Sequence, residues 1–229
     1  MSDYGLKIIN TSSGIQIDST YKNYVKLAVG SVGISVGSND VDITDTSQVP
    51  IIAFKPQSGE FSCNYGFTKS GANFTHAKFM CGDTSITCYW KEYVEGQVLS
   101  LPSYGLVVYN TSGIIVFSSE DYPMNIISIN TGSFAYSVGG GAYADETVVD
   151  ADNNYFIIVD IFPLYYEGVL ISNPPPVYAA YYYTRGLKYI NSTTIRVGQF
   201  VFGGVGGSGY PPASYDGWIN AYTLIEVKG

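Results

Sequence analysis

The sequence reads YGLKIINTSSGIQIDS at residues 4–19 and YGLVVYNTSGIIVFSS at residues 104–119, so one phrase occurs twice. The two copies share Tyr-Gly-Leu, Asn-Thr-Ser and Gly-Ile when Ser13 is skipped in the comparison. An internal repeat indicates the number of structural units in a chain. We therefore predict two β domains, residues 1–100 and 101–229, each of which begins with one copy of the phrase.

Each copy has the pattern of a β-hairpin. In the first copy, Tyr4, Leu6 and Ile8 alternate with Gly5, Lys7 and Ile9, which is the period of a strand. The residues Asn-Thr-Ser-Ser-Gly that follow are typical of a turn, and Gly14 tolerates a positive φ angle there. Ile15 and Ile17 then resume the alternation, which predicts the second strand of the hairpin.

The two copies differ in the polarity of one face. In the gapped comparison, the polar residues of the first copy align with apolar residues of the second; the pairs are Lys7 and Val107, Gln16 and Ile115, and Asp18 and Phe117. A strand pair that is apolar on both faces is normally covered on both faces. We therefore predict that Val107, Ile115 and Phe117 are buried against another domain or subunit, with a covering loop of the same domain as the alternative. The polar residues of the first copy should stay at least partly exposed.

The composition is typical of a β protein. Only 13% of the 229 residues are charged, compared with about a quarter in an average domain. Tyrosine and glycine are abundant, and short alternating apolar runs are separated by turn residues about every 8–12 positions. No segment has the pattern of an amphipathic helix. The predicted fold class is therefore all-β, with two β-sandwich-like domains related by the internal repeat.

The charge balance excludes some classes of partner. The net charge is −8 and there are only 11 basic residues, which argues against binding to the phosphate backbone of a nucleic acid. No apolar run reaches the roughly 18 residues of a spanning helix, and the N-terminus lacks the pattern of a secretory signal. The three cysteines do not suggest a disulfide framework. We expect a soluble chain that is made in a reducing cytoplasm and does not insert into a membrane.

Two motifs were considered as chemical sites and rejected. GVGGSG at residues 204–209 matches a dinucleotide-binding fingerprint, but Tyr-Pro-Pro follows it where the motif requires a helix. We interpret it as an exposed loop. His76 is the only histidine, and its spacing from Cys81 and Cys88 lacks the paired form of a zinc site. We therefore predict no catalytic residue, no metal site and no cofactor.

Two groups of carboxylates leave alternatives open. Asp40, Asp42 and Asp45 carry the oxygen ligands that calcium prefers, but no glycine turn or distal glutamate completes a calcium loop. Alternation in a solvated strand accounts for these residues equally well, so calcium binding stays open. The segment ADETVVDADNN (144–154) is interpreted as a solvated acidic turn, with a glycoside-hydrolase carboxylate pair as an alternative.

A tyrosine-rich segment, PPPVYAAYYYTRGLKY (174–189), predicts a strand with aromatic residues on both faces. Tyr181 and Tyr183 would share one face, and Tyr182 would lie on the other. Such a strand is either buried on both sides or forms a contact surface for a sugar or a protein. In the second case, Tyr215 and Trp218 are candidates for the same surface.

The opening pattern resembles the start of a group of tail-associated proteins of long-tailed bacteriophages. The resemblance rests on Tyr-Gly-Leu, an apolar strand, Asn, Ser-Gly and a second strand closing on Asp-Ser at residues 18–19. The second copy departs from it, because Phe117-Ser118 stands where Asp-Ser is expected. The resemblance implies a structural role at the tail tip and contact with the host, and it implies no catalytic residues.

The expected function is therefore a non-enzymatic structural component of a bacteriophage tail tip or tail fibre. Such a component would be made in the host cytoplasm and would be located in the virion. Its expected partners are other tail proteins, further copies of itself, and a glycan or protein of the host surface. The alternative is a carbohydrate-binding β-sandwich module of the lectin or adhesin kind.

Overall fold

The structure is a computed structural model, and it describes residues 7–9, 15–18, 24–56, 60–82, 84–95, 104–109, 112–113, 115–118, 122–135, 141–159, 165–172, 177–207 and 219–229. Within these ranges, side chains are described except at residues 7–9, 15–18, 116, 165–172, 177–183, 201–207 and 219–220. Every regular element of the described residues is a β-strand, which confirms the all-β prediction.

The described residues form 17 strands. In chain order they are β1 (Lys7–Ile9), β2 (Ile15–Asp18), β3 (Tyr24–Ile34), β4 (Gly37–Thr46), β5 (Ile51–Lys55), β6 (Ser62–Ser70), β7 (Asn73–Cys81), β8 (Ile86–Glu95), β9 (Val107–Tyr109), β10 (Ile115–Ser118), β11 (Ile126–Ala135), β12 (Tyr143–Thr147), β13 (Tyr155–Val159), β14 (Tyr165–Ser172), β15 (Val177–Asn191), β16 (Thr194–Gly207) and β17 (Ile219–Val227).

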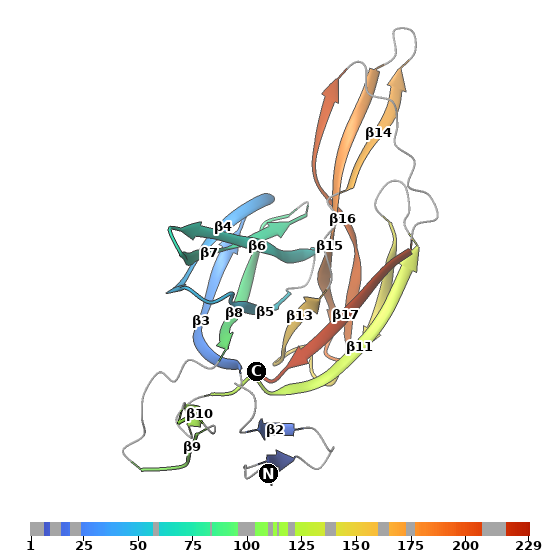
Figure 1. Cartoon of the computed structure of the whole chain (residues 1–229). Helices are drawn as coiled ribbons and strands as arrows, with labels where there is room; N and C mark the ends of the chain where they lie inside the picture. The colour runs from blue at the N-terminus through green and yellow to red at the C-terminus, as the bar shows by residue number, and fades with distance from the viewer. Residues whose placement is uncertain are drawn as a thin grey trace.

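Two large antiparallel sheets pack face to face as a sandwich (Figure 1). The six-stranded sheet has the order β11-β17-β13-β5-β8-β3. The second large sheet has the order β12-β16-β15-β6-β7-β4, with β14 paired to β15. Each sheet is therefore made of three strands from the N-terminal half followed by strands from the C-terminal half, and the two halves meet at their inner strands.

The strand order of one half repeats that of the other. From the middle of the six-stranded sheet outward, the N-terminal half contributes β5, β8 and β3, and the C-terminal half contributes β13, β17 and β11. The second sheet repeats the relation, with β6, β7 and β4 on one side and β15, β16 and β12 on the other. The sandwich therefore has an internal pseudo-two-fold axis between its halves.

The register confirms this equivalence at the level of single residues. The β3–β8 pairing shifts by one residue between Lys26 and Ala28, and the β11–β17 pairing shifts between Ile126 and Ser128. Ala28 pairs with Glu92, and Ser128 pairs with Glu226 (both pairs directly follow the shift). A β-bulge at the same place in both halves is a feature that two unrelated pairings would rarely share.

The predicted domain boundary between residues 100 and 101 does not separate the sheets. Phe54 of the first half pairs with Phe156 of the second, and Ser62 pairs with Leu187. A single large core cluster also includes buried residues from both halves, such as Ile34 and Tyr222. The repeat is therefore real, but its two copies share two continuous sheets and one core. If one half were alone, its edge strands β5 and β6 would expose unpaired backbone N–H and C=O groups. In the sandwich, β13 and β15 of the other half pair with these edges.

The core is built from the alternating apolar positions of the strands. Phe54 and Phe79, from opposite sheets, meet edge to face with their ring centroids 5.9 Å apart. Gly30 lies beneath the ring of Trp90, where a Cβ atom would come within 2.6 Å of a ring carbon. Packing therefore explains why a glycine stands at this strand position: a residue with a side chain would collide with the Trp90 ring.

The two repeated phrases form the hairpins β1–β2 and β9–β10, each a separate two-stranded sheet. Ile8 pairs with Ile17 in the first hairpin, and Val108 pairs with Phe117 in the second. Both hairpins thus have the same register at a constant offset of 100 residues, without the gap at Ser13. The gapped comparison matched Phe117 with Asp18, whereas the strand pairing matches it with Ile17, an apolar residue.

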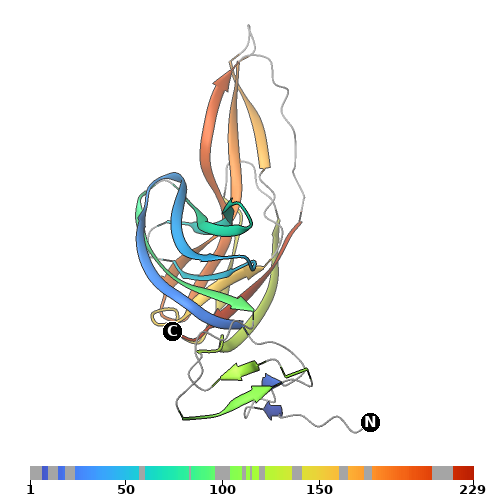
Figure 2. The same ribbon diagram turned by 60° about the vertical axis from the view of Figure 1, so that its left-hand side comes forward.

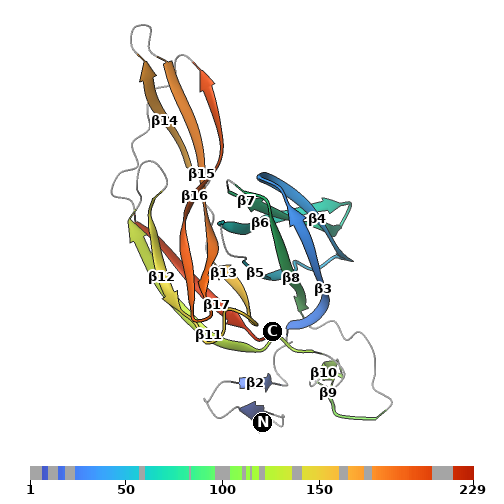
Figure 3. The same ribbon diagram turned by 180° about the vertical axis from the view of Figure 1, so that it is seen from behind.

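The C-terminal half has an extension that the N-terminal half lacks. β15 and β16 are 15 and 14 residues long, whereas their counterparts β6 and β7 are each 9 residues long. In this additional length, β15 pairs with β14 on one side and with β16 on the other, and the three strands project from the sandwich as an arm, coloured orange at the top of Figure 2. The two hairpins lie at the opposite end of the sandwich, which is also visible from behind in Figure 3.

Candidate functional site

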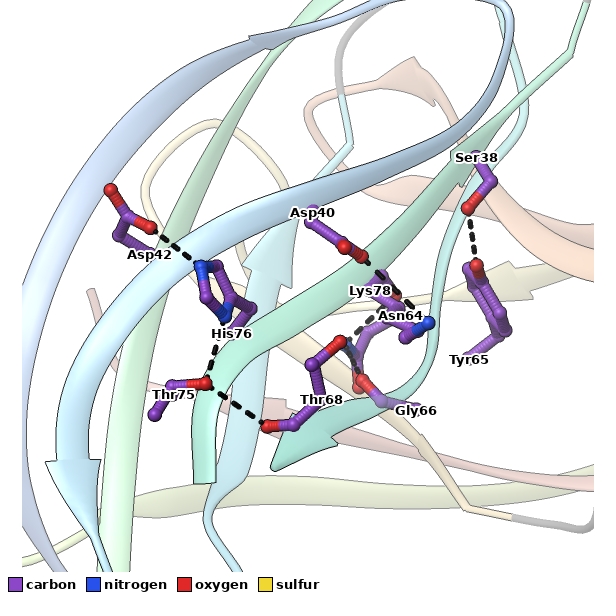
Figure 4. Close-up of polar contacts among 10 residues, drawn as sticks. All are labelled: Ser38, Asp40, Asp42, Asn64, Tyr65, Gly66, Thr68, Thr75, His76 and Lys78. Atoms are coloured by element: carbon purple, nitrogen blue, oxygen red, sulfur yellow. Dashed lines mark hydrogen bonds and ion pairs between the residues drawn. The ribbon is translucent and has the colours of Figure 1, made fainter. Parts of the chain in front are cut away.

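The polar face of β4, β7 and β6 carries the only histidine and several of the carboxylates that the sequence singled out. Asp42 of β4 is the cross-strand partner of His76 on β7, and Asp40 is the partner of Lys78. The side chains of these four residues lie together on this face (Figure 4). They form the row of alternating acidic and basic groups expected for a solvated sheet face.

His76 is placed between an acid and a hydroxyl group. Its Nε2 atom lies 3.0 Å from an oxygen of Asp42, and its Nδ1 atom lies 2.8 Å from the Oγ1 atom of Thr75 (Figure 4). A carboxylate, an imidazole and a hydroxyl group occur in the same order in a catalytic triad. However, 95% of the Asp42 side chain is exposed, so water screens this ion pair strongly. The geometry therefore favours a surface ion pair over a nucleophilic centre, which works in a site shielded from water.

The remaining polar contacts of this face stabilise its backbone. The amide of Asn64 donates to the carbonyl oxygens of Lys78, at 3.1 Å, and Gly66, at 3.3 Å. These bonds span the register shift between Asn64 and Gly66. Ser38 and Tyr65 share a short hydrogen bond between their hydroxyl groups. These polar groups therefore bond to their neighbours on the face, and they do not converge on a common position where a ligand could bind.

Two of the three aspartates considered for calcium, Asp40 and Asp42, each face a basic side chain. Asp42 faces His76, and Asp40 lies 4.0 Å from the ammonium group of Lys78. Cys81 and Cys88, considered with His76 for zinc, are fully buried. Burial raises the pKa of the Cys88 thiol, which disfavours the thiolate that a metal needs. Among the described residues, no group of three or more His, Cys, Asp or Glu side chains is placed to hold a metal ion.

The C-terminal half has its own acid–base pair in the equivalent strands. Arg196 of β16 donates two hydrogen bonds to Asp145 of β12, at 2.6 and 2.8 Å. Hydrogen bonding from Arg196 lowers the pKa of Asp145 below its usual value. The guanidinium group also lies 3.6 Å from the ring centroid of Tyr143, half of whose surface is exposed. An aromatic ring, a guanidinium and a carboxylate side by side are groups that can contact a sugar or a peptide.

A buried carboxylate is the best-organised polar centre among the described residues. Glu226 of β17 is 1% exposed and faces the interior of the sandwich. Its oxygens accept hydrogen bonds from Val149 N (2.9 Å), Asp150 N (2.9 Å), Asn154 Nδ2 (2.7 Å) and Ser128 Oγ (2.8 Å). Burial opposes ionisation, but these donors together outweigh it and lower the pKa of Glu226. Glu226 therefore links β17 to β11 and to the turn between β12 and β13.

Glu92 occupies the equivalent position of the N-terminal half and is less well bonded. It is bonded by Thr44 alone, through the backbone N–H at 3.0 Å and through the side-chain hydroxyl, and its other oxygen has no partner among the described residues. Ala28 stands where the C-terminal half has Ser128, and Pro50 stands where it has Asn154. Both side-chain donors are thus missing, and burial raises the pKa of Glu92.

The hairpin residues predicted to form an interface are partly described. Phe117 is 9% exposed, and Val107 and Ile115 are half-buried. The side chains of Lys7, Gln16 and Asp18, predicted to be exposed, lie outside the described residues. Which domain or subunit covers the second hairpin therefore stays a prediction.

The tyrosine-rich segment is placed as backbone only. Tyr181, Tyr182 and Tyr183 lie in β15, in the projecting arm, and pair with Glu167, Tyr166 and Tyr165 of β14. Their side chains, together with all of Tyr215 and Trp218, lie outside the described residues. Residues 204–207 of the glycine motif belong to strand β16, so the prediction of a loop is wrong for that part. A strand at this place supports the rejection of the dinucleotide site, which requires a turn into a helix.

A small apolar cavity lies between the sheets where the two halves meet. It has a volume of about 170 Å³, and its lining includes Ile52, Phe67 and Ile158. Ligand sites usually measure about 300–1,000 Å³, so this space is small for an organic substrate. It is better explained as a packing gap beside the pseudo-two-fold axis.

Sequence reasoning missed the Glu226 network and the Asp145–Arg196 pair. A signal for Glu226 was present, because it continues the buried alternation of Tyr222 and Leu224 in β17. A charged residue on the core face of a strand needs internal partners. Asp145 had no comparable signal, because its partner lies 51 residues further along the chain.

No protein-family model, no curated protein and no solved structure matches this chain. The described residues contain no helix that is long and apolar enough to cross a membrane.

Proposed function

We propose that the chain is a non-enzymatic structural component of a bacteriophage tail tip or tail fibre, located in the virion. In this role it assembles with other tail proteins and with copies of itself, and it contacts the host surface. The observation that carries the proposal is the opening phrase, which resembles tail-associated proteins and is built twice as a hairpin of the same register. Repeated β modules are well suited to an assembly, because each copy offers a surface of the same shape.

The architecture supports an assembly role in two further ways. The arm formed by β14, β15 and β16 extends the backbone well beyond the sandwich, where a neighbouring subunit or a host molecule can reach it (Figure 1). The hairpins lie at the other end and carry exposed apolar residues, including Tyr104 at 88% and Tyr109 at 53%. Large apolar side chains that are exposed close together are typical of surfaces that bind other proteins.

Mass spectrometry of purified virions tests this proposal directly. Particles of the phage that encodes the chain, banded in a density gradient, should contain its peptides in a constant ratio to the major tail proteins. A non-structural protein of the same phage serves as the control and should be absent. Absence of the chain from intact particles would refute the proposal.

A carbohydrate-binding module is the second candidate, and the exposed Tyr143 beside Arg196 and Asp145 favours it. Sugars bind to aromatic rings through their apolar faces and to charged groups through their hydroxyls. If this site binds a glycan, the isolated chain should bind saturably to a glycan array, and Tyr143→Ala should remove that binding. A virion protein with no glycan binding would favour the structural role alone.

A further inference from the structure

The six-stranded sheet is apolar on both of its faces. Phe54, Trp90 and Leu224 point into the core cluster between the sheets. Their chain neighbours point the other way, because side chains alternate along a strand. A second cluster, with Ala53 and Ile157 at its centre, lies on that outer face. We call this surface the outer face of the six-stranded sheet.

One row of cross-strand partners shows the character of the outer face. From edge to edge it consists of Ile129, Ile225, Ile157, Ala53, Lys91 and Val29. Ile129 and Val29 occupy equivalent places in the two halves, and each is 58% exposed. Val159 is 46% exposed and Tyr89 is 39% exposed on the same face. Ala53 and Ile157, at the centre of the row, are only 0% and 9% exposed, so the apolar surface that meets water lies mainly toward the two edges of the sheet. Monomeric proteins rarely leave several large apolar side chains of one sheet face in water, so this surface is expected to be covered.

The charges divide the outer face into two wings. The lysine wing comprises the outer positions of β5, β8 and β3, where Lys26, Lys55 and Lys91 lie, with one carboxylate, Glu95, at the end of β8. The uncharged wing comprises the outer positions of β13, β17 and β11, where the sequence has no charged residue. Burial and the nearby charge of Lys26 lower the pKa of Lys91. Lys91 also lies 4.5 Å from the ring centroid of Tyr155, a residue of the uncharged wing.

These observations point to a particular occupant. We propose that the outer face binds the outer face of a second copy of this chain, about a two-fold axis parallel to the strands. Such an axis places the lysine wing of one copy over the uncharged wing of the other. The like charges are then kept apart, and lysine side chains can lie along apolar and aromatic surface, as Lys91 already does on Tyr155 within one chain.

The internal symmetry strengthens this contact. When the two-fold axis between the copies crosses the pseudo-two-fold axis of each outer face, a contact of Val29 with the second copy is accompanied by an equivalent contact of Ile129. The area of the face can be estimated from the strand lengths. Six strands about 4.8 Å apart span about 24 Å. The central strands β5 and β13 are 5 residues long, about 17 Å, whereas the strands on either side reach about 30 Å. The face therefore measures about 400–700 Å² per copy, which lies around the lower limit of standard interfaces, about 1,200 Å² in total.

Sedimentation velocity of the full chain, at about 1 to 200 µM, tests the proposal. The wild type should form a dimer as the concentration rises. Val29→Asp and Ile129→Asp should each weaken the dimer more than tenfold, and to a similar extent, because the two positions are equivalent. The matched control is Val36→Asp, since Val36 is 51% exposed but lies in the turn that leaves the sheet. This variant should dimerise like the wild type.

Three results would overturn the proposal. The first is a wild type that stays monomeric over this range. The second is an oligomer that the two substitutions leave unchanged while circular dichroism shows that both variants are folded. The third is binding of the wild type, but not of Val29→Asp or Ile129→Asp, to vesicles of 70% phosphatidylcholine and 30% phosphatidylglycerol. That last result would assign the outer face to a lipid surface. None of these outcomes bears on whether the chain is a virion protein.

Discussion

Replacement of Glu226 by glutamine should destabilise the protein far more than the same change at Glu92. The glutamate accepts hydrogen bonds from four donor groups, on Ser128, Val149, Asp150 and Asn154. An amide has one acceptor oxygen, and its NH₂ group would face donors. Three of these donors, Val149 N, Asp150 N and Asn154 Nδ2, reach the same oxygen, Oε1, so a glutamine oxygen at that position can keep them only as weaker, neutral hydrogen bonds. The Ser128 hydroxyl, which donates to the other oxygen, should lose its acceptor on Glu226→Gln.

The expected magnitude follows from the cost of buried donors without partners. One such donor costs about 1–3 kcal/mol, so Glu226→Gln should lower the free energy of unfolding by about 1–3 kcal/mol. In a chain of this size, about 1 kcal/mol shifts the melting temperature by about 2–4 °C. A loss of about 2 kcal/mol therefore corresponds to about 4–8 °C. Urea unfolding followed by circular dichroism at pH 7 measures the first quantity, and a thermal scan measures the second.

Glu92→Gln is the matched control, because Glu92 holds the equivalent position in the other half. Its only donor residue, Thr44, can be satisfied by one amide oxygen, because Oε1 of Glu92 has no partner among the described residues. The substitution also removes a buried carboxylate whose other oxygen has no partner among the described residues. Stability should therefore change by less than about 1 kcal/mol. Ala28→Ser should improve the same site, because it restores the hydroxyl donor that Ser128 supplies in the C-terminal half.

The two glutamates also predict opposite dependences on pH. The folded-state pKa of Glu226 is lowered, so its contribution is present above the usual value of 4.5 and is lost as the pH falls through the folded pKa. The difference between wild type and Glu226→Gln should therefore shrink on acidification. The folded-state pKa of Glu92 is raised, so the native state loses stability as the pH rises from 4.5 through the folded pKa. Glu92→Gln should remove this loss.

The reasoning would be refuted by equal losses for Glu226→Gln and Glu92→Gln. It would also be refuted by a difference between wild type and Glu226→Gln that stays constant from neutral pH to pH 3. Either result would show that the Glu226 network contributes no more than ordinary packing.

Three further substitutions test other parts of the structure. Gly132→Ala should lower stability by about 1–3 kcal/mol in urea unfolding, because the new Cβ atom would come within 2.5 Å of Cζ of the buried Tyr222. Asp145→Asn should cost less than about 1 kcal/mol, and less still in 1 M salt, because the pair with Arg196 is partly exposed. Phe117→Asp should lower the melting temperature or weaken assembly, because it places an unpaired carboxylate at a buried position.

Each of the three substitutions has a control variant or a control condition. Gly33→Ala should be tolerated, since a Cβ atom at Gly33 meets nothing within 4 Å. A similar loss at both glycines would contradict the packing argument for Gly132. A salt-independent loss of several kcal/mol for Asp145→Asn would show that the pair is not screened. Tyr109→Asp changes an exposed residue of the same hairpin, and an unchanged Phe117→Asp variant would show that this side chain is solvated.

The sequence was sufficient to predict local features. Alternation of apolar residues identified the strands, and the repeated phrase identified both hairpins and the duplication, because these depend on neighbours along the chain. The polar alternation of Asp40 and Asp42 was also correctly interpreted as compatible with a solvated strand face. A sequence of this kind determines which segments can be strands and which of their faces can be buried.

Only the tertiary structure decided how the two repeats are combined. β5 pairs with β8 of its own half on one edge and with β13 of the other half on the other edge. The local sequence pattern of β5 would be the same if this second edge were unpaired. The sequence therefore could not distinguish two separate domains from one shared sandwich. The same holds for Glu226 and Arg196, whose partners lie 51 to 98 residues away in the chain. The physical reason is that sheet pairing and buried hydrogen bonds join distant segments. The energies of these contacts depend on which strand edges pair with each other. The sequence of a single strand does not specify its pairing partner.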